Sequence, residues 1–312
     1  MYSSFTIPIL LITFNRPKHT RQVWDAIKKQ HPKYMYVFQD GPREGNETDK
    51  EKCSDVRAIF DEPLDWDCEI KIFYSDVNMG CGKGPAAAIT WFFDNVEQGI
   101  IFEDDCFPAD SLFEFYEQLL NDYKDENKVS LITGTNLKAK WKSKNKSYVF
   151  STVGAATMGS WASWRRVWVS FDYYITSWSS EETKCTIKNN LANKHYFDYF
   201  ASEFNVYNSI IQNHVWDYQW FFCRLLSNSL SIVSTVNQMS NIGFGDESTH
   251  TSNPNDSRSN MVLYDMKFPL IKSNIRRDKL FDWVVFNRFT SKKKKTIFKK
   301  IILRCIENLY CR

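Results

Sequence analysis

Three consecutive acids, Glu103, Asp104 and Asp105, directly follow the apolar segment 99–102. Carboxylates this close together repel one another, and a shared cation relieves that repulsion. Mn²⁺ and Mg²⁺ bind carboxylate oxygens and leave coordination positions for phosphate oxygens. The triplet therefore predicts a divalent-cation site, with Mn²⁺ or Mg²⁺ as the expected cofactor. The alternative is an acidic cluster at the start of the next helix, where the helix dipole stabilises negative charge.

Two further pairs of residues directly follow apolar runs and could bind a phosphorylated ligand. Asn15 and Arg16 follow the first apolar run of the chain, and Asp40 and Gly41 follow the second. Arg16 offers a fixed positive charge for a diphosphate, and Asp40 offers a carboxylate for a ribose or a base. Arginines also begin helices and aspartates also form turns, so the prediction depends on the order of these residues along the chain.

A glycine-rich segment, 78–84, contains three of the 11 glycines of the chain. Glycine lets the backbone approach a ligand closely, so Asn78, Gly80, Gly82 and Lys83 are candidate ligand contacts. The segment is not a P-loop, because its Gly-Lys pair is not followed by Ser or Thr. No G-x-G-x-x-G motif follows the first apolar run either, so a dinucleotide cofactor is not expected.

Strand-like and helix-like patterns alternate through the first 135 residues and must position these groups. Strands are predicted at 5–14, 34–38, 69–74, 99–102 and 129–133, and helices at 21–29, 49–60, 85–96 and 111–123. Such alternation predicts an α/β fold with a doubly wound, mostly parallel sheet. Ligands bind at the carboxyl ends of the strands in such sheets, so the acidic triplet, Arg16 and Asp40 should share one crevice.

The second half of the chain has a different pattern. It is rich in Trp and Tyr, and its helical patterns, at about 161–170, 196–212 and 216–227, lack regular strand partners. Indole rings pack on the C–H faces of sugars, although most tryptophans are core residues. This half is therefore expected to be an aromatic-rich unit joined to the α/β half.

The combined order of motifs resembles a GT-A glycosyltransferase: strand-Asn-Arg-Pro, strand-Asp-Gly, Asn-x-Gly-x-Gly-Lys, strand-Glu-Asp-Asp and a later Trp-Asp. More closely, residues 7–250 resemble bacterial nucleotide-diphospho-sugar transferase-like proteins, also labelled hemolytic-protein-like. The inverting N-acetylglucosaminyltransferase I family is similar more distantly. The resemblance implies metal-dependent transfer of a sugar from a nucleotide-diphosphate sugar to a glycan or lipid-linked acceptor, with inversion, in the assembly of a bacterial surface polysaccharide.

The resemblance also implies roles for the residues already named. Asp105 would bind the metal, and Glu103 and Asp104 would contact the ribose and the sugar of the donor. Arg16 and Asp40 would hold the nucleotide. The metal and Arg16 would then stabilise the leaving diphosphate.

Asp217, in the sequence WDYQW at 216–220, corresponds to the Trp-Asp segment of the family. An aspartate there deprotonates the acceptor hydroxyl, which is a poor nucleophile without a base. The family carries two successive acids at this point, whereas Tyr218 follows Asp217 here. The alternative is that Trp216 and Trp220 are core residues on one helix, with Asp217 on its solvent face.

Two later segments also match family patterns. Residues 240–251 resemble the Ser/Asn-x-Gly-x-Gly loop that closes over the donor, in which Gly243 and Gly245 suit a mobile lid. His250 would meet the diphosphate or the metal, or else be a structural residue of the loop. Residues 159–166 resemble the acceptor-side segment of the family, and no catalytic role is assigned to them.

Length and composition agree with such an enzyme. The 312 residues suit one large α/β domain or two small ones, and 43% hydrophobic with 25% charged residues excludes a disordered or collagen-like chain. The eight scattered cysteines indicate neither a disulfide framework nor a zinc site. We expect residues 1–135 to bind the nucleotide sugar, 136–275 to bind the acceptor and carry catalysis, and 276–312 to form C-terminal helices.

The net charge of +3 is unevenly distributed. Residues 291–312 contain eight basic residues and one acid, a net charge of +7, which leaves −4 for residues 1–290. Apolar residues recur at one-turn spacing from Ile297 onward, with Lys299 and Arg304 on the other face. This pattern is typical of a basic amphipathic helix on an anionic membrane surface. The alternative is a helix that packs on the body of the protein or on another subunit.

These features predict where the protein acts. Residues 292–311 are expected to bind an anionic membrane, and nucleic acid is not an expected partner. No apolar run reaches the roughly 20 residues of a membrane span, and the N-terminus is not built like a signal peptide. We therefore expect a cytoplasmic protein, peripheral on the inner face of the cell membrane.

Two other functions remain open at this point. A sugar nucleotidyltransferase would need a glycine-rich loop with Arg or Lys directly after the first strand, where Asn15-Arg16-Pro17 stands. A non-catalytic nucleotide- or sugar-binding protein would bind the same ligands without turnover.

Overall fold

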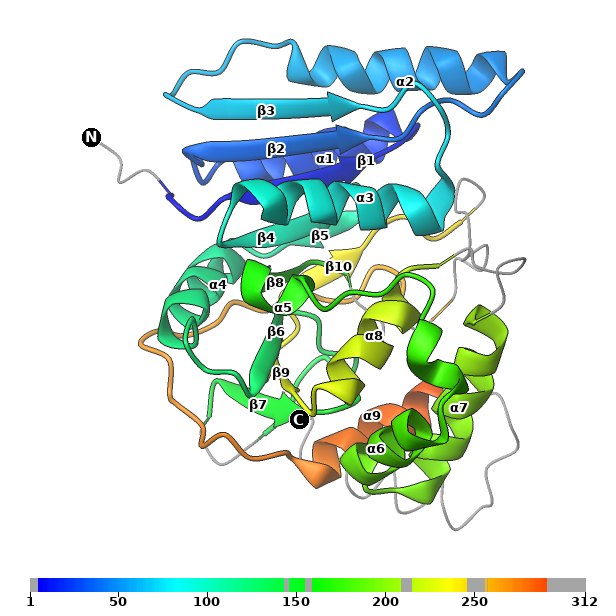
Figure 1. The fold of residues 1–312 in the computed structure, drawn as a ribbon. Coiled ribbons are helices and arrows are strands. Elements are labelled where there is room, and N and C mark those ends of the chain that lie inside the picture. Colours follow the sequence, from blue (N-terminus) through cyan, green and yellow to red (C-terminus); the bar gives the residue numbers. More distant parts are fainter. Residues whose placement is uncertain are drawn as a thin grey trace.

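A computed structural model describes residues 5–142, 146–154, 159–208, 215–245, 256 and 258–290. One sheet of eight strands organises this part of the chain, in the order β3-β2-β1-β4-β8-β6-β9-β7 (Figure 1). Its first four strands are all parallel and are β1 (Ile9–Thr13), β2 (Tyr34–Gln39), β3 (Glu69–Tyr74) and β4 (Gln98–Glu103). The prediction of a mostly parallel α/β sheet is confirmed.

The second half of the chain completes the same sheet. β8 runs antiparallel between β4 and β6, β9 is parallel to β6, and β7 forms the antiparallel edge. β5 and β10 form a separate two-stranded sheet. The bounds are β5 (Cys106–Pro108), β6 (Val129–Thr133), β7 (Tyr148–Ser151), β8 (Trp161–Trp164), β9 (Leu230–Ser234) and β10 (Met239–Asn241). The second half therefore contributes β7, β8 and β9 to the sheet, strands that the sequence did not predict.

Helices cover both faces of the sheet, as a doubly wound fold requires. In β1, Leu10 and Ile12 face one core and Ile9 and Leu11 face the other, because side chains alternate along a strand. The core of Ile9 and Leu11 includes α1 (Pro17–Lys28), α2 (Glu47–Phe60) and α4 (Ser111–Asp122). The opposite core includes α3 (Gly80–Asn95), α5 (Arg165–Trp168), the short helix η1 (Thr176–Ser179), α6 (Glu181–Leu191), α7 (Lys194–Tyr207), α8 (Asp217–Leu226) and α9 (Lys279–Phe289).

The predicted helix at 161–170 is wrong, because residues 161–164 form β8 and only α5 is helical. Trp161 packs into one core, whereas Ala162 and Trp164 pack into the other. A strand buried on both faces shows no alternation of polar and apolar residues, so its apolar run cannot be told from a buried helix. The predicted helices at 196–212 and 216–227 correspond to α7 and α8.

Strands on both sides of residue 135 belong to the one sheet, so the assignment of donor and acceptor roles to 1–135 and 136–275 stays a prediction.

No helix within the described ranges is long and apolar enough to cross a membrane. The basic segment 292–311 lies outside the described residues. In the described part of the chain, all six cysteines are outside disulfides.

Candidate functional site

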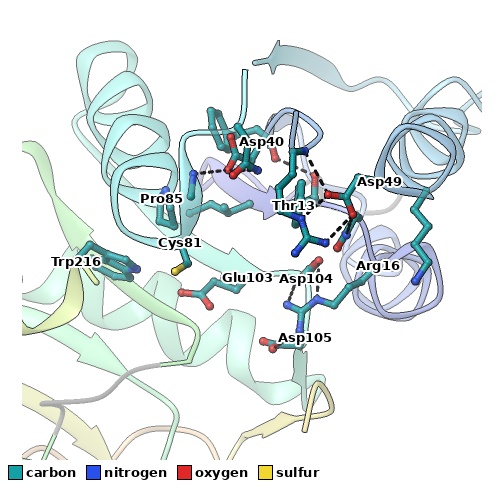
Figure 2. Close-up of a pocket in the computed structure, with 18 of the residues that line it drawn as sticks. Thr13, Arg16, Asp40, Asp49, Cys81, Pro85, Glu103, Asp104, Asp105 and Trp216 are labelled. Atoms are coloured by element: carbon teal, nitrogen blue, oxygen red, sulfur yellow. Dashed lines mark hydrogen bonds and ion pairs between the residues drawn. The ribbon is translucent and has the colours of Figure 1, made fainter. Parts of the chain in front are cut away.

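A pocket of about 890 Å³ opens at the carboxyl ends of β1, β2 and β4 (Figure 2). β2 lies on one side of β1 and β4 on the other, so the direction of winding reverses here. A crevice at such a reversal is where open α/β sheets bind ligands. Nine residues predicted from the sequence line this pocket: Asn15, Arg16, Asp40, Asn78, Gly80, Glu103, Asp104, Asp105 and Asp217.

Arg16 contacts two members of the acidic triplet. It is the last residue before α1, with Pro17 in the first turn, so the end of β1 directs it into the pocket. Its Nε and Nη2 donate to the two oxygens of Asp104, and its Nη1 donates to Asp105 Oδ2 at 3.0 Å. A guanidinium can bind two carboxylates at once because its donors form a rigid fork. The predicted phosphate-binding cation and the predicted metal ligand are thus direct neighbours.

Glu103 differs from the two aspartates. Figure 2 shows its carboxyl group pointing towards Cys81 and Trp216, away from Arg16. Within the described ranges this carboxyl group forms no hydrogen bond or ion pair. Burial and the charges of Asp105 and Asp104 raise the pKa of Glu103 to about 8. Glu103 therefore tends to keep its proton near neutral pH, and Asp104 and Asp105 together carry one formal negative charge more than Arg16 neutralises.

A cation fits this site only if the site has negative charge that Arg16 leaves uncompensated. Two aspartate carboxyl groups share the Arg16 guanidinium, and a divalent cation would offset the repulsion that remains between them. In the described part of the chain, no three His, Cys, Asp or Glu side chains are grouped so that they could hold a metal ion. The described residues therefore do not form a complete metal site by themselves, and the divalent cation stays a prediction.

Asp40 is fixed by the segment that precedes α3. Its Oδ1 accepts the amides of Gly41 at 3.0 Å and Met79 at 2.7 Å. Its Oδ2 accepts the amide of Gly80 at 2.9 Å and Asn78 Nδ2 at 3.2 Å. These four bonds support the turn role that the sequence left open for Asp40. Contact with a nucleotide remains a prediction.

These bonds also explain where α3 begins. The sequence predicted a loop over 78–84 and a helix from Pro85, but α3 begins at Gly80. Asp40 accepts amides at this helix end, which stabilises a start that the local sequence does not signal. Pro85 consequently lies in the second turn, rather than the first turn that was predicted for it.

Five of the predicted ligand contacts in the described residues lie outside the pocket lining, namely Gly41, Gly82, Lys83, Gly243 and Gly245. A β-carbon at Gly41 would come within 2.5 Å of the Val77 carbonyl carbon, so Gly41 allows two backbone segments to pack closely. Gly82 is buried within α3, and the side chain of Lys83 is exposed and lines a separate groove. The glycines of this segment therefore serve packing as well as the pocket.

Asp217 lies in the same pocket as the acidic triplet although more than one hundred residues separate them. It is the first residue of α8, directly after Trp216, which is 6% exposed and stacks on Trp161 with ring centroids 5.9 Å apart. The suggestion that Trp216 and Trp220 are core residues is confirmed. Asp217 lines the pocket instead of facing open solvent, and burial raises its pKa to about 6.

The segment after β10 covers the triplet. The amide of Ile242 donates to the Asp105 carbonyl at 2.9 Å. A β-carbon at Gly243 would lie 2.3 Å from Asp105 Oδ2 and 2.7 Å from Arg16 Nη1, so a larger residue here would displace these two side chains. Gly245 has a φ of +137° and open space around it. His250 lies outside the described residues, so its predicted contact with the donor stays a prediction.

One group of pocket residues was missed from the sequence. Asp49 is 2% exposed and accepts Asn15 Nδ2 at 2.7 Å and Arg43 Nη2 at 2.8 Å. The hydrogen bonds from Arg43 lower the pKa of Asp49 to about 2. Lys52 also lines this side of the pocket. The available signal was Asn46, which caps α2 through the Asp49 amide, but it indicates a helix start and not a ligand.

No protein-family model and no curated protein matches the sequence. Solved structures with a similar fold include the galactosyltransferase LgtC in complex with donor and acceptor sugar analogues. That structure is 10% identical, with a TM-score of 0.39, over 82% of this chain and 85% of its own. Mouse xyloside xylosyltransferase 1 is 11% identical, with a TM-score of 0.34, over 70% and 81%.

Nucleotidyltransferases are similar to the same degree. A putative glucose-1-phosphate thymidylyltransferase from Bacillus anthracis is 10% identical, with a TM-score of 0.33, over 53% of this chain and 74% of its own. Similarities this low concern the α/β architecture and do not distinguish one reaction from another.

Proposed function

We propose that the protein is a metal-dependent glycosyltransferase of the GT-A type, which transfers a sugar from a nucleotide-diphosphate sugar to a glycan or lipid-linked acceptor. One observation carries the proposal: a single pocket contains Arg16, the Glu103-Asp104-Asp105 triplet and Asp217. Sugar transfer from a diphosphate requires stabilisation of the leaving group and a base for the acceptor hydroxyl. The pocket has candidates for both.

The donor half of the reaction depends on Arg16 and the triplet. Asp105 would hold Mn²⁺ or Mg²⁺ together with the donor phosphates, and such a cation stabilises negative charge on a leaving diphosphate. Glu103 and Asp104 would contact the ribose and the sugar of the donor. Arg16 would supply a second positive charge, held in place by Asp104. Asn15, with Arg43 and Lys52 on the α2 side, would bind the nucleoside end of the donor.

The acceptor half depends on Asp217. Its pKa of about 6 leaves it ionised at neutral pH and close enough to neutrality to accept a proton as the hydroxyl attacks. A base on α8, on a different element from the triplet, favours direct displacement and therefore inversion at the anomeric carbon. Trp216, which directly precedes Asp217, borders the part of the pocket where the acceptor would lie.

A thermal-shift screen with nucleotide diphosphates and their sugars, with and without Mn²⁺, tests donor binding. A ligand that binds the fold raises the melting temperature by mass action. The Asp105→Ala variant should lose the part of the shift that depends on Mn²⁺. Asp110→Ala is the matched control, since Asp110 is exposed and outside the pocket lining. Equal shifts in wild type and Asp105→Ala would refute the metal assignment.

Turnover separates the remaining alternatives. A glycosyltransferase releases nucleoside diphosphate from its donor, whereas a sugar nucleotidyltransferase releases pyrophosphate from a nucleoside triphosphate and a sugar phosphate. Binding of donors and acceptors without either product would favour a binding protein. Asp217→Asn should bind the donor and lose transfer.

We also propose that residues 292–311 attach the enzyme to an anionic membrane, where a lipid-linked acceptor of a surface polysaccharide would be found. The support comes from the sequence, in which basic residues alternate with an apolar face. Deletion of residues 291–312 should abolish cosedimentation with vesicles of anionic phospholipid and leave the nucleotide thermal shift unchanged. Unfolding of the truncated protein would instead show that this segment is part of the core.

A further inference from the structure

A second cavity, of about 620 Å³, lies on the outer side of α3. It forms between α3 and the segment after α5, and aromatic side chains dominate its wall. Its aromatic members are Trp91, Phe171, Tyr173 and Tyr174. Lys83, Asp94 and Thr90 provide polar groups along α3. We refer to this cavity as the α3 groove.

The α3 groove adjoins the pocket of the candidate site. Both are lined by the start of α3, with Gly80 and Cys81 on the pocket side and Met79 and Lys83 on the groove side.

A row of aromatic rings in contact with one another also joins the two walls. Trp216 lines the pocket and contacts the ring of Trp168, with centroids 6.4 Å apart. Trp168 in turn stacks on Phe171 at 4.3 Å, with an interplanar angle of 14°. Trp168 also donates from Nε1 to the Thr90 hydroxyl at 3.0 Å. The side chains between the pocket and the groove are therefore tightly packed, and this packing fixes the position of one cavity relative to the other.

The chemistry of the groove selects among ligands. Tyr174 is 45% exposed, so a ring is available for contact. Lys83 and Asp94 are exposed, and within the described ranges neither side chain forms an ion pair. Their opposite charges cancel, which disfavours nucleic acid and other strongly charged polymers. Aromatic faces beside hydrogen-bonding side chains suit sugar rings, whose C–H faces are apolar and whose hydroxyls donate and accept.

We propose that the α3 groove binds a neutral oligosaccharide, and that these sugars are the part of the acceptor that extends beyond the pocket. Lys83 and Asp94 are eleven residues apart on one helix, a separation of about 16 Å. This length exceeds a single sugar ring, so the groove suits a short chain. The acceptor role rests on the proposed glycosyltransferase function, whereas oligosaccharide binding itself does not.

A glycan array of neutral oligosaccharides of two to six sugars tests the binding. The wild type should bind members of the array. The Lys83→Ala/Tyr174→Ala double variant should bind the same members with an affinity at least about tenfold lower. Both positions are exposed, so the variant should fold. Lys188→Ala/Val206→Ala is the matched control, because these residues are exposed on α6 and α7 and lie outside the groove.

The outcomes separate this proposal from the proposed function. Binding that persists in the double variant, or a wild type that binds no array member, overturns the groove proposal. Preferential binding of peptides or phospholipid vesicles that depends on Tyr174 also overturns it, in favour of another partner. A wild type that binds oligosaccharides but no nucleotide diphosphate contradicts the glycosyltransferase and leaves the oligosaccharide site standing. Loss of glycan binding should leave the nucleotide thermal shift of the double variant unchanged.

Discussion

Replacing Asp217 with Asn should make the protein more stable at neutral pH while it abolishes transfer. The carboxylate of Asp217 is half-buried, and burial raises its pKa from 3.8 to about 6. Each unit of pKa corresponds to about 1.4 kcal/mol, so charging this group in the folded protein costs at most about 3 kcal/mol. Solvent contact reduces that figure, and we expect a gain of between about 1 and 3 kcal/mol for Asp217→Asn.

The pH dependence follows from the sign of the shift. A carboxyl group with a raised folded pKa holds its proton in the folded state when the unfolded state has already lost it. Stability therefore falls as pH rises from about 4 to about 6 and stays lower above that range. The advantage of Asp217→Asn should be absent at pH 4 and complete at pH 7.5. Asn retains the oxygen that accepts the Tyr218 amide, a bond of 2.9 Å in the wild type.

Urea unfolding of the wild type and the variant at pH 4, 6 and 7.5 measures the difference in the free energy of unfolding. Asp198→Asn is the control, because Asp198 is exposed on α7 and pairs only with Lys194 in the described structure. Its effect should stay below about 0.5 kcal/mol. If Asp217→Asn is no more stable than the wild type at pH 7.5, the carboxylate is not destabilised by burial and the reasoning fails.

Three other changes test separate parts of the site. If Asp217 is the general base, kcat/KM for transfer should rise with pH through about 6, and a flat profile from pH 5 to 7.5 would exclude this role. Asp49→Asn removes a carboxylate whose pKa is lowered from 3.8 to about 2. The variant should lose about 1 to 2 kcal/mol of stability at pH 7, and this loss should shrink as pH falls from 4 to 2; a loss independent of pH would show that charge is not the cause. Gly243→Ala places a β-carbon against Asp105 and Arg16, so the melting temperature should fall and nucleotide diphosphate should bind more weakly, whereas an unchanged thermal shift would separate this segment from the donor pocket.

The sheet and much of the pocket were predictable from the sequence, because local patterns carried the information. The four parallel strands appear in the sequence as apolar runs that alternate with helical patterns. The polar residues that follow these strands come together because the carboxyl ends of parallel strands lie at the same edge of the sheet. Asp217 required the resemblance to a family, since nothing local connects it to the triplet. β8 was missed because it is buried on both faces, and the start of α3 was missed because Asp40 stabilises it from another segment. Asp49 and Arg43 were missed because their sequence is that of an ordinary helix start.

The position of β8 determines how the chain can be divided into fragments. Strand β8 comes from the second half of the sequence and lies between β4 and β6, which come from the first half. It pairs with both of these strands. A fragment that ends at residue 135 would leave the inner edges of β4 and β6 without a partner, and unpaired edges favour aggregation. Separately expressed fragments 1–135 and 136–312 should therefore be insoluble alone and become soluble only when produced together. Exchange of residues 136–312 with the matching part of another protein would succeed only if that part brings a strand that fits between β4 and β6.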